Sequence, residues 1–435
     1  MAMKDRGWRL RAERAERGLT EDALAREMRR WAELHGAPRP DITANAVAEW
    51  EEGARPLDST ALRLLWLALE TPNDGWADVD VDVWSLFRPA RREASDRARR
   101  REFLGSVASI GNPEALDADR LDAVLDETVR VDPRVVESLG VVARQFNRRW
   151  GLEAPHVMRR QMHVHLEVIL TLLDHAMGGD LRRDLESAAA TTAANAGSVS
   201  ILVGRPDTAA VYLQLALRWA RDADDAEGEA AALLFSSRLY SHVCPARPTG
   251  DPARAQALLE AADHRLRRRT APVANAWVLL RAAEEVAGAD ELAAFRLADE
   301  ADRLVATAGS VPADGVCSRW SADLQIAYRG NINVLAGRPA SGIPLLEAAL
   351  AAFGKERVAT RPMATADLAG AYAQLGEIDH ACTLLGEALR QAEAAGLPDP
   401  VMRVRRIRDQ RLGAHASHAA VRELDERLSA GAGVP

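Results

Sequence analysis

The sequence predicts an all-α protein in which a short N-terminal helical module precedes a long array of repeated helices. Alanine and leucine, which favour helix, are plentiful, whereas runs of β-branched residues are scarce. The composition, 48% hydrophobic and 28% charged, is that of a globular protein. A fourteen-residue pattern also recurs within residues 106–435, and such recurrence is typical of repeat architectures.

Composition limits the classes of function. The formal net charge is −8, and lysine occurs only at positions 4 and 355, so DNA binding would need a local basic surface. The three cysteines lie far apart without a CxxC pair, which favours a reduced cytoplasmic protein. No stretch has the length and apolar character of a membrane span, and the N-terminus lacks the apolar region of a signal peptide. We therefore expect a cytoplasmic protein with no membrane partner.

The first two helices of the N-terminal module are predicted from their end signals. Residues 8–17 form a helix with Leu10 facing inward, and Gly18 ends it. Thr20 is placed to cap a longer second helix over residues 23–36. The acidic residues directly after Thr20 suit the positive N-terminal end of that helix.

A third and a fourth helix follow a proline-containing break. Pro38 and Pro40 interrupt the helical pattern. Thr43 is placed to cap the third helix, whose sequence ANAVAEWEE covers residues 44–52 before Gly53. Residues 62–69 form a further amphipathic helix. Its packing residues are Leu62, Leu65, Trp66 and Leu69.

Two stretches of this module resemble the phage-repressor (XRE) type of helix-turn-helix. LRAERAERGLTEDALARE (10–27) is similar to that family's first-helix and LSQEELA pattern, and AVAEWEEGARPL (46–57) is similar to its VSRWERGRRPL ending. Two features depart from the family. WAELHGAPRP (31–40) is an insertion between the second and third helices, and the polar or basic positions before the tryptophan are Ala48 and Glu49.

The resemblance implies that residues 1–70 are a DNA-binding domain whose third helix enters the major groove. The positions that would face bases are Thr43, Ala44, Asn45 and Ala48. Asn45 is the best candidate reader, because asparagine can form two hydrogen bonds with adenine. Trp50 is expected in the core, and Glu51 is expected to make a structural hydrogen bond or ion pair. Phosphate contacts would come from Arg26, Arg29, Arg39 and Arg55.

The charge of this module leaves two interpretations open. Residues 1–70 carry 12 basic and 13 acidic side chains, so a single module should bind DNA weakly. A homodimer would double the contacts, and an arginine-rich linker over residues 71–105 would add to them. The alternative is a protein-interaction adaptor whose helix-turn-helix no longer reads DNA, because the third helix contains three glutamates and no basic residue.

Residues 106–435 are predicted to form an α-solenoid of helix pairs. GRPDTAAVYLQLAL (204–217), GRPASGIPLLEAAL (337–350) and GEIDHACTLLGEAL (376–389) share one pattern, and weaker copies begin at Gly250 and Gly288. Each glycine would end one helix before a short turn into the next. Successive glycines lie 46, 38, 49 and 39 residues apart. This exceeds the tetratricopeptide period of about 34 residues, so the pairs are tetratricopeptide-like with lengthened helices or loops, and a HEAT-like array is the alternative.

Both parts together resemble actinobacterial transcription regulators that join such a helix-turn-helix to a tetratricopeptide-like array. RREFL (100–104) and residues 193–225 also resemble that family. The architecture is similar to that of the peptide-sensing quorum regulators of Firmicutes. The resemblance implies a dimeric regulator that binds double-stranded DNA and whose array senses a small molecule, a peptide or a protein partner.

Polar residues on the first helix of each pair are the candidate ligand contacts, because these helices line the concave face of such arrays. The polar candidates are Asn195, Arg238, Asn275, Arg281, Gln325 and Asn331, with Trp277 and Tyr328 as apolar walls. A purely scaffolding or dimerising role for the repeats is the alternative.

Catalytic signatures are missing from the sequence, which contains no GxGxxG, Walker A, HExxH or GxSxG motif. His163 and His165 would point in opposite directions on one helix, so they do not predict a metal site. The acidic pairs Glu284-Glu285 and Asp224-Asp225 are expected on solvated faces. We therefore expect neither an enzyme nor a cofactor.

Overall fold

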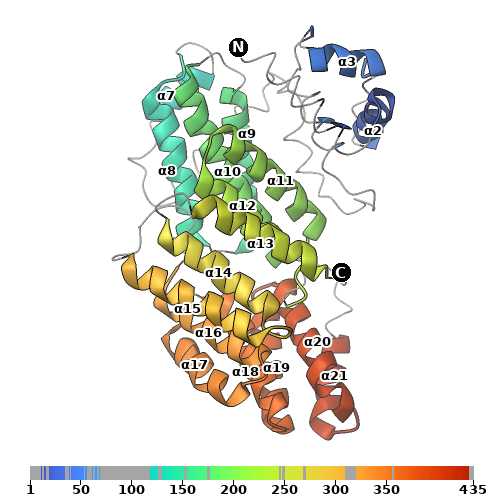
Figure 1. The fold of residues 1–435 in the computed structure, drawn as a ribbon, viewed down its shortest axis with the longest axis vertical. Coiled ribbons are helices and arrows are strands. Elements are labelled where there is room, and N and C mark those ends of the chain that lie inside the picture. The colour runs from blue at the N-terminus through green and yellow to red at the C-terminus, as the bar shows by residue number, and fades with distance from the viewer. Residues whose placement is uncertain are drawn as a thin grey trace. The chain divides into compact units, whose positions relative to one another are not determined.

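Every regular element in the described parts of the chain is a helix, which confirms the predicted all-α class (Figure 1). The structure is a computed structural model. It describes residues 11, 14–15, 19–34, 39, 41–52, 54–55, 61, 64–65, 68, 118–125, 130–150, 154–173, 177–243, 246, 250–267, 271–308, 320–354 and 357–430.

The chain divides into two compact units, Met1–Ala98 and Arg99–Pro435. The division falls inside the predicted linker over residues 71–105. That whole linker, including RREFL and the arginine-rich run at 88–101, lies outside the described residues.

Two helices, α2 (Glu21–Leu34) and α3 (Ala44–Glu52), carry the first unit. Both predicted threonine caps are present. The Thr20 hydroxyl accepts a hydrogen bond from the Ala23 amide at 3.1 Å, and the Thr43 hydroxyl accepts one from the Ala46 amide at 3.2 Å.

The core of the first unit forms where α2 and α3 meet. Leu24, Met28 and Trp31 from α2 are buried in it with Val47 and Trp50 from α3. Ile42, just before α3, is fully buried, and the Arg29 side chain donates to its carbonyl oxygen. This contact ties the segment just before α3 to α2.

The two flanking helices predicted for this unit are described only in part. Leu65 is buried, as predicted. Leu10, Gly18, Gly53, Leu62, Trp66 and Leu69 lie outside the described residues.

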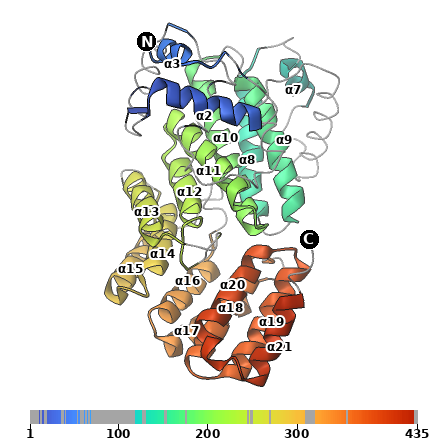
Figure 2. The ribbon, with the colours of Figure 1, turned by 90° about the vertical axis from the view of Figure 1, so that its right-hand side faces the viewer.

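The second unit is a succession of helices that follow one another along the array in chain order (Figures 1 and 2). They are α7 (Ala118–Leu125), α8 (Pro133–Arg149), α9 (Pro155–Leu173), α10 (Gly179–Leu202), α11 (Pro206–Asp222), α12 (Ala226–Ser237), α13 (Pro252–Leu266), α14 (Pro272–Val286), α15 (Glu291–Thr307), α16 (Ala322–Leu335), α17 (Pro339–Ala352), α18 (Thr360–Gln374), α19 (Ile378–Ala394), α20 (Pro398–Leu412), the 3₁₀ turn η3 (Gly413–His415) and α21 (Ala419–Ala430).

The three strong repeat copies end their first helices as predicted. Gly204, Gly337 and Gly376 adopt φ values of 71°, 77° and 84°, which other residues rarely tolerate. The amide after each glycine bonds the carbonyl five residues earlier, at 2.8, 2.8 and 3.0 Å, which is the Schellman pattern. The weaker copies at Gly250 and Gly288 lack this positive φ.

The helices pair as α10–α11, α12–α13, α14–α15, α16–α17 and α18–α19. The first helix of each pair also contacts the first helix of the next, so these helices form an inner row. Burial follows this division, since α14 buries most of its residues, whereas α15 buries only Ala294, Ala298 and Ala301.

The inner row returns to its starting point. Helix α20 contacts α18 and also α10, so α10, α12, α14, α16, α18 and α20 form a closed ring. Leu202 at the end of α10 shares an apolar cluster with Ala359 and Leu397. The Arg238 guanidinium, at the end of α12, donates to the Asp399 carboxylate of α20 at 2.6 Å. We call this contact region between α10–α12 and α20 the seam.

Among the described residues, no helix combines the length and the apolar character that crossing a bilayer requires.

Candidate functional site

The third helix of the sequence prediction, α3, is anchored by one face. Trp50 is 3% exposed and belongs to the core, as predicted. The buried Glu51 carboxylate accepts hydrogen bonds from Arg14 at 2.5 and 2.9 Å and from Arg11 at 3.2 Å. The structural role predicted for Glu51 is therefore confirmed.

The candidate base readers lie in the first half of α3 and just before it, and they differ in exposure. Thr43 and Asn45 are exposed, and Ala44 and Ala48 are half-buried. Thr43 has a structural role, because its hydroxyl caps the helix. Asn45, at the second helical position, is exposed to solvent.

The four candidate phosphate contacts are engaged within the first unit. Arg26 pairs with Asp22, and Arg29 donates to a backbone carbonyl. Arg39 makes two hydrogen bonds to Asp41, at 2.9 and 3.0 Å, and Arg55 reaches the same carboxylate at 3.5 Å. These hydrogen bonds, chiefly those from Arg39, hold the pKa of Asp41 below its usual value.

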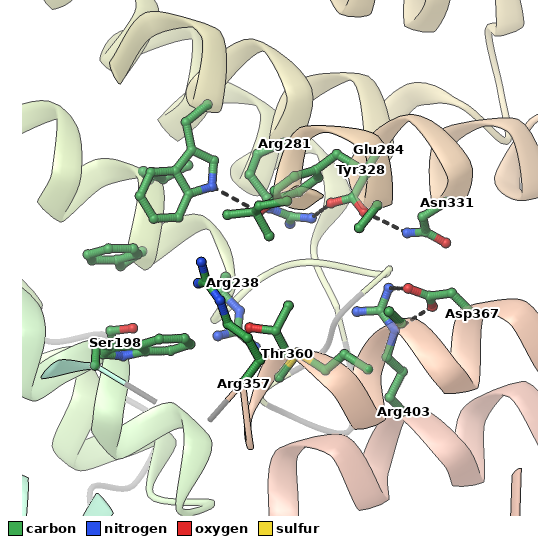
Figure 3. A pocket seen from close by; sticks show the side chains of 18 residues that line it. Ser198, Arg238, Arg281, Glu284, Tyr328, Asn331, Arg357, Thr360, Asp367 and Arg403 are labelled. Carbon is green, nitrogen blue, oxygen red and sulfur yellow. Dashed lines mark hydrogen bonds and ion pairs between the residues drawn. The ribbon is translucent and has the colours of Figure 1, made fainter. Parts of the chain in front are cut away.

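The second candidate site is a cavity inside the ring of inner helices (Figure 3). Its volume is about 130 Å³. Side chains from α10, α12, α14, α16, α18 and α20 line it, together with Trp150 and Arg357 from the turns. The closed ring therefore surrounds a space that every inner helix borders.

Five of the eight predicted groove residues line this cavity: Arg238, Trp277, Arg281, Tyr328 and Asn331. The other three do not. The Asn195 amide donates to the Thr191 carbonyl within α10 at 2.8 Å. Gln325 donates to Asp302 of α15. Asn275 lies two residues before Trp277, which places it on another face of α14.

One part of the cavity wall is aromatic. Trp277 packs edge-on against Phe235 at a centroid distance of 6.0 Å, and its indole nitrogen donates to the Tyr328 hydroxyl at 2.9 Å. Trp150, Leu234 and Met363 add apolar surface to the lining. This wall can pack against a flat or aliphatic ligand.

The polar part of the wall contains buried ion pairs. Arg403 makes a bidentate contact with Asp367 at 2.6 and 2.8 Å, and Arg281 pairs with Glu284. The Asn331 amide also donates to Glu284 at 2.5 Å. Figure 3 shows these groups meeting along one side of the cavity.

The prediction that Glu284 and Glu285 are solvated is wrong. They are 4% and 5% exposed, because Arg281, Asn331, Ser241 and His242 provide them with hydrogen-bonding partners. Asp224 is exposed, as predicted, but Asp225 caps α12 and accepts from the Ser187 hydroxyl. A charge pair in sequence therefore does not identify an outer face when an arginine lies one helical turn away.

Burial and ion pairing shift the pKa values of Asp367 and Glu285 in opposite directions. Burial raises the pKa of Asp367 to about 6, although Arg403 acts against the shift. For Glu285, burial acts upward, yet the hydrogen bond from His242 and the charge of Arg281 prevail and lower its pKa to about 2. The pKa of Asp367 is therefore raised and that of Glu285 lowered, although both carboxyl groups are buried.

Arg357 differs from the other lining arginines. Its guanidinium donates to the Ser321 hydroxyl at 3.3 Å. Within the described residues, no carboxylate lies within ion-pair distance of it, whereas Arg238, Arg281 and Arg403 each have a buried carboxylate partner.

The histidines singled out in the sequence serve the packing of helices. His163 lies 3.2 Å from the Tyr212 hydroxyl, and His165 is fully buried beside Thr192. Burial lowers the pKa of His165 to about 3. The described ranges contain no group of three or more His, Cys, Asp or Glu side chains arranged to hold a metal ion.

Sequence reasoning missed the lining residues from the last repeats and the turns. They include Trp150, Arg357, Thr360, Asp367 and Arg403. A polar residue on the first helix of a pair was the available signal, and Asp367 on α18 meets it. Arg403 and Trp150 line the cavity only because the inner row of helices closes into a ring. No local sequence pattern predicts this closure.

No protein-family model matches the chain, and no curated protein matches its sequence.

Proposed function

We propose that the protein is a dimeric transcription regulator whose N-terminal unit binds operator DNA and whose helical array responds to a ligand. The observation that carries this proposal is the division of roles along α3. Trp50 and Glu51 are buried and hold the helix in the unit, while Thr43 and Asn45 stay exposed at its N-terminal end. The XRE-type pattern assigns these positions to base contact, and Asn45 is the member that can read adenine.

The charge of the N-terminal unit supports a dimer. Arg26, Arg39 and Arg55 are shared with internal carboxylates, so each gives up part of an ion pair when it meets a phosphate. Affinity for DNA depends largely on the number of phosphates neutralised. Two units bound to an inverted repeat would double that number.

The array supplies the regulatory half of the proposal. Tetratricopeptide-like arrays use their inner helices to bind ligands, and here these helices surround a cavity with both aromatic and charged walls. A ligand that binds there would favour one arrangement of the repeats. The array would pass that preference to the DNA-binding units through the dimer.

Binding of the full chain to its own upstream DNA tests the proposal. Fluorescence anisotropy at about 50 and 150 mM salt should show specific binding that weakens steeply with salt. Asn45→Ala should weaken specific binding by about tenfold and leave random-sequence binding unchanged. Glu33→Gln, on the exposed surface of α2, is the matched control. A protein that prefers no upstream fragment over random DNA at either salt concentration is not such a regulator.

A second candidate function is a protein-interaction adaptor. Glu49 and Glu52 are exposed on α3 and would repel phosphate, which favours a basic protein partner. Affinity capture from cell extract separates the two functions. A regulator recovers defined DNA fragments, whereas an adaptor recovers a basic protein whose binding is lost in Glu49→Lys.

A further inference from the structure

We infer that the cavity of the inner ring binds a small monocarboxylate that carries an aromatic ring or a short apolar body. The regulatory meaning of this site rests on the proposed function. The site itself is argued from the size, charge and walls of the cavity.

The size of the cavity favours a small ligand. A cavity of about 150 Å³ accommodates benzene, and this one has about 130 Å³ and is partly open to solvent, so it can enclose about one ring while a substituent extends towards the opening. An extended peptide of five residues spans roughly 16 Å and needs an open groove. The inner row closes from α20 onto α10, so the ring does not present the open concave face that such a peptide would follow.

The pairing of the lining arginines indicates which charge the ligand carries. Arg238, Arg281 and Arg403 are matched by Asp399, Glu284 and Asp367. Glu285, which is not part of the lining, is a second partner of Arg281 at 2.6 Å and also contacts His242 and Ser241.

The lining arginine that remains is Arg357, whose guanidinium donates to the Ser321 hydroxyl at 3.3 Å and has no carboxylate within ion-pair distance among the described residues. Its guanidinium reaches into the cavity in Figure 3. A partly enclosed guanidinium without a carboxylate attracts an anion more strongly than the same group would in water. The local surroundings of Arg357, rather than a net charge of the lining, therefore favour a carboxylate beside it.

The aromatic and apolar walls of the cavity indicate the shape and polarity of the rest of the ligand. Trp277, Phe235 and Tyr328 provide aromatic surface, and Met363 adds a flexible apolar side chain. Thr360, three residues after Arg357, adds a hydroxyl to the lining. A carboxylate held by Arg357 and Thr360 would place its apolar part against this wall.

Titration of the full-length protein with a matched set of probes tests the inference. Phenylacetate and hexanoate should bind in calorimetry, whereas neutral phenylacetamide should bind at least about tenfold more weakly and cationic phenethylamine should not bind. Equal binding of phenylacetate and phenylacetamide overturns the proposal. So does the absence of binding by both carboxylates at millimolar concentration.

Variants then locate the bound carboxylate. Arg357→Gln should weaken phenylacetate binding about tenfold or more, because it removes the charged donor. Arg390→Gln, on the exposed surface of α19, is the matched control and should bind as the parent does. If Arg357→Gln does not fold by circular dichroism, Ala364→Leu replaces it, because the larger side chain fills the cavity and should abolish binding. Unchanged affinity in the folded variant overturns the inference.

The calorimetric measurement contains no DNA, so its failure is distinct from failure of the proposed regulation. Carboxylate binding without specific DNA binding would support the carboxylate site and contradict the proposed regulator function. Specific DNA binding without carboxylate binding would retain the regulator and remove this ligand class. If the protein binds both phenylacetate and specific DNA, and phenylacetate changes the affinity for DNA, the cavity is the regulatory site of the proposed regulator.

Discussion

Asp367 is a buried carboxyl group of the cavity wall whose pKa is raised. Its carboxylate is buried, and it keeps its charge only because Arg403 donates two hydrogen bonds to it. Burial nevertheless raises its pKa to about 6. Protonation would therefore weaken an ion pair that joins α18 to α20.

The sign of the resulting pH dependence follows from linkage. In an unfolded chain the Asp367 pKa returns to about 3.8, below the folded value of about 6, so between these values the folded state binds more protons. The contribution of Asp367 to the free energy of unfolding must therefore fall as the pH rises from 4 to 6. Glu285 has the opposite shift, and its contribution is lost only as the pH falls towards 2.

Asp367→Asn should remove this pH dependence. The amide cannot ionise, so the difference in unfolding free energy between variant and parent should change by up to about 3 kcal/mol between pH 4 and pH 7, in favour of the variant at the higher pH. Urea unfolding at several pH values measures this difference. A difference that stays constant across the range would show that Asp367 keeps an ordinary pKa in the fold.

Sequence patterns predicted residue roles where the reason is local. Trp50 and Glu51 belong to a motif whose packing recurs, and Thr20 and Thr43 cap helices that begin beside them. The burial of Glu284 was only partly signalled locally: Arg281 stands one turn before it, but its other partner, Asn331, lies 47 residues further along the chain.

At the scale of elements, the close approach of paired helices depends on small residues. A Cβ atom on Gly197 of α10 would lie 2.6 Å from Leu213 of α11, and one on Gly330 of α16 would lie 2.7 Å from Leu346 of α17. Each of these glycines stands seven residues before a glycine with positive φ. The same short distance between helices is therefore built into two repeats.

Gly197→Ala should destabilise the second unit although alanine is the better helix former. The added methyl group forces Leu213 to move, and such overpacking costs about 1–3 kcal/mol. The matched control is Gly370→Ala in α18, where the new Cβ would lie 3.6 Å from Ile407. That control should gain up to about 1 kcal/mol from helix propensity. Urea unfolding of both variants checks the contrast, and equal stabilisation of both would refute the packing argument.

The helix pairs were the most predictable part of the fold. The glycines of the three strong copies identify the turns, because a positive φ at a helix end selects glycine. The second helices begin two residues later, at Pro206, Pro339 and Ile378. The curvature of the array was not predictable, because it results from small rotations added over several pairs.

At the scale of the whole second unit, the seam joins elements that are distant in the chain. Arg238 and Asp399 are separated by 161 residues, and their side chains are only 15% and 6% exposed. Around them, Leu202 and Leu397 share an apolar cluster, and a Cβ on Gly204 would lie 3.0 Å from Pro398. The closure therefore combines an ion pair with apolar packing.

Asp399→Ala should open the seam without unfolding the outer helices. Removing one partner of a buried ion pair costs about 3–5 kcal/mol, because the other charge stays buried. Hydrogen–deuterium exchange should rise in α20 and at the ends of α10 and α12 and stay unchanged in α15. Asp299→Ala, which removes an exposed partner of Arg329, is the control. Exchange confined to α20 alone would mean that the ring does not depend on this contact.

Closure also restricts how such a chain can evolve. An open solenoid can gain or lose a repeat, because each unit contacts only its neighbours. In this chain, deleting the α14–α15 pair would shorten the path between Arg238 and Asp399 and remove a segment of the ring. The number of repeats is therefore fixed by circumference, as the number of strands is in a closed barrel. Length variation should be confined to the outer helices and turns, where an insertion leaves the circumference unchanged.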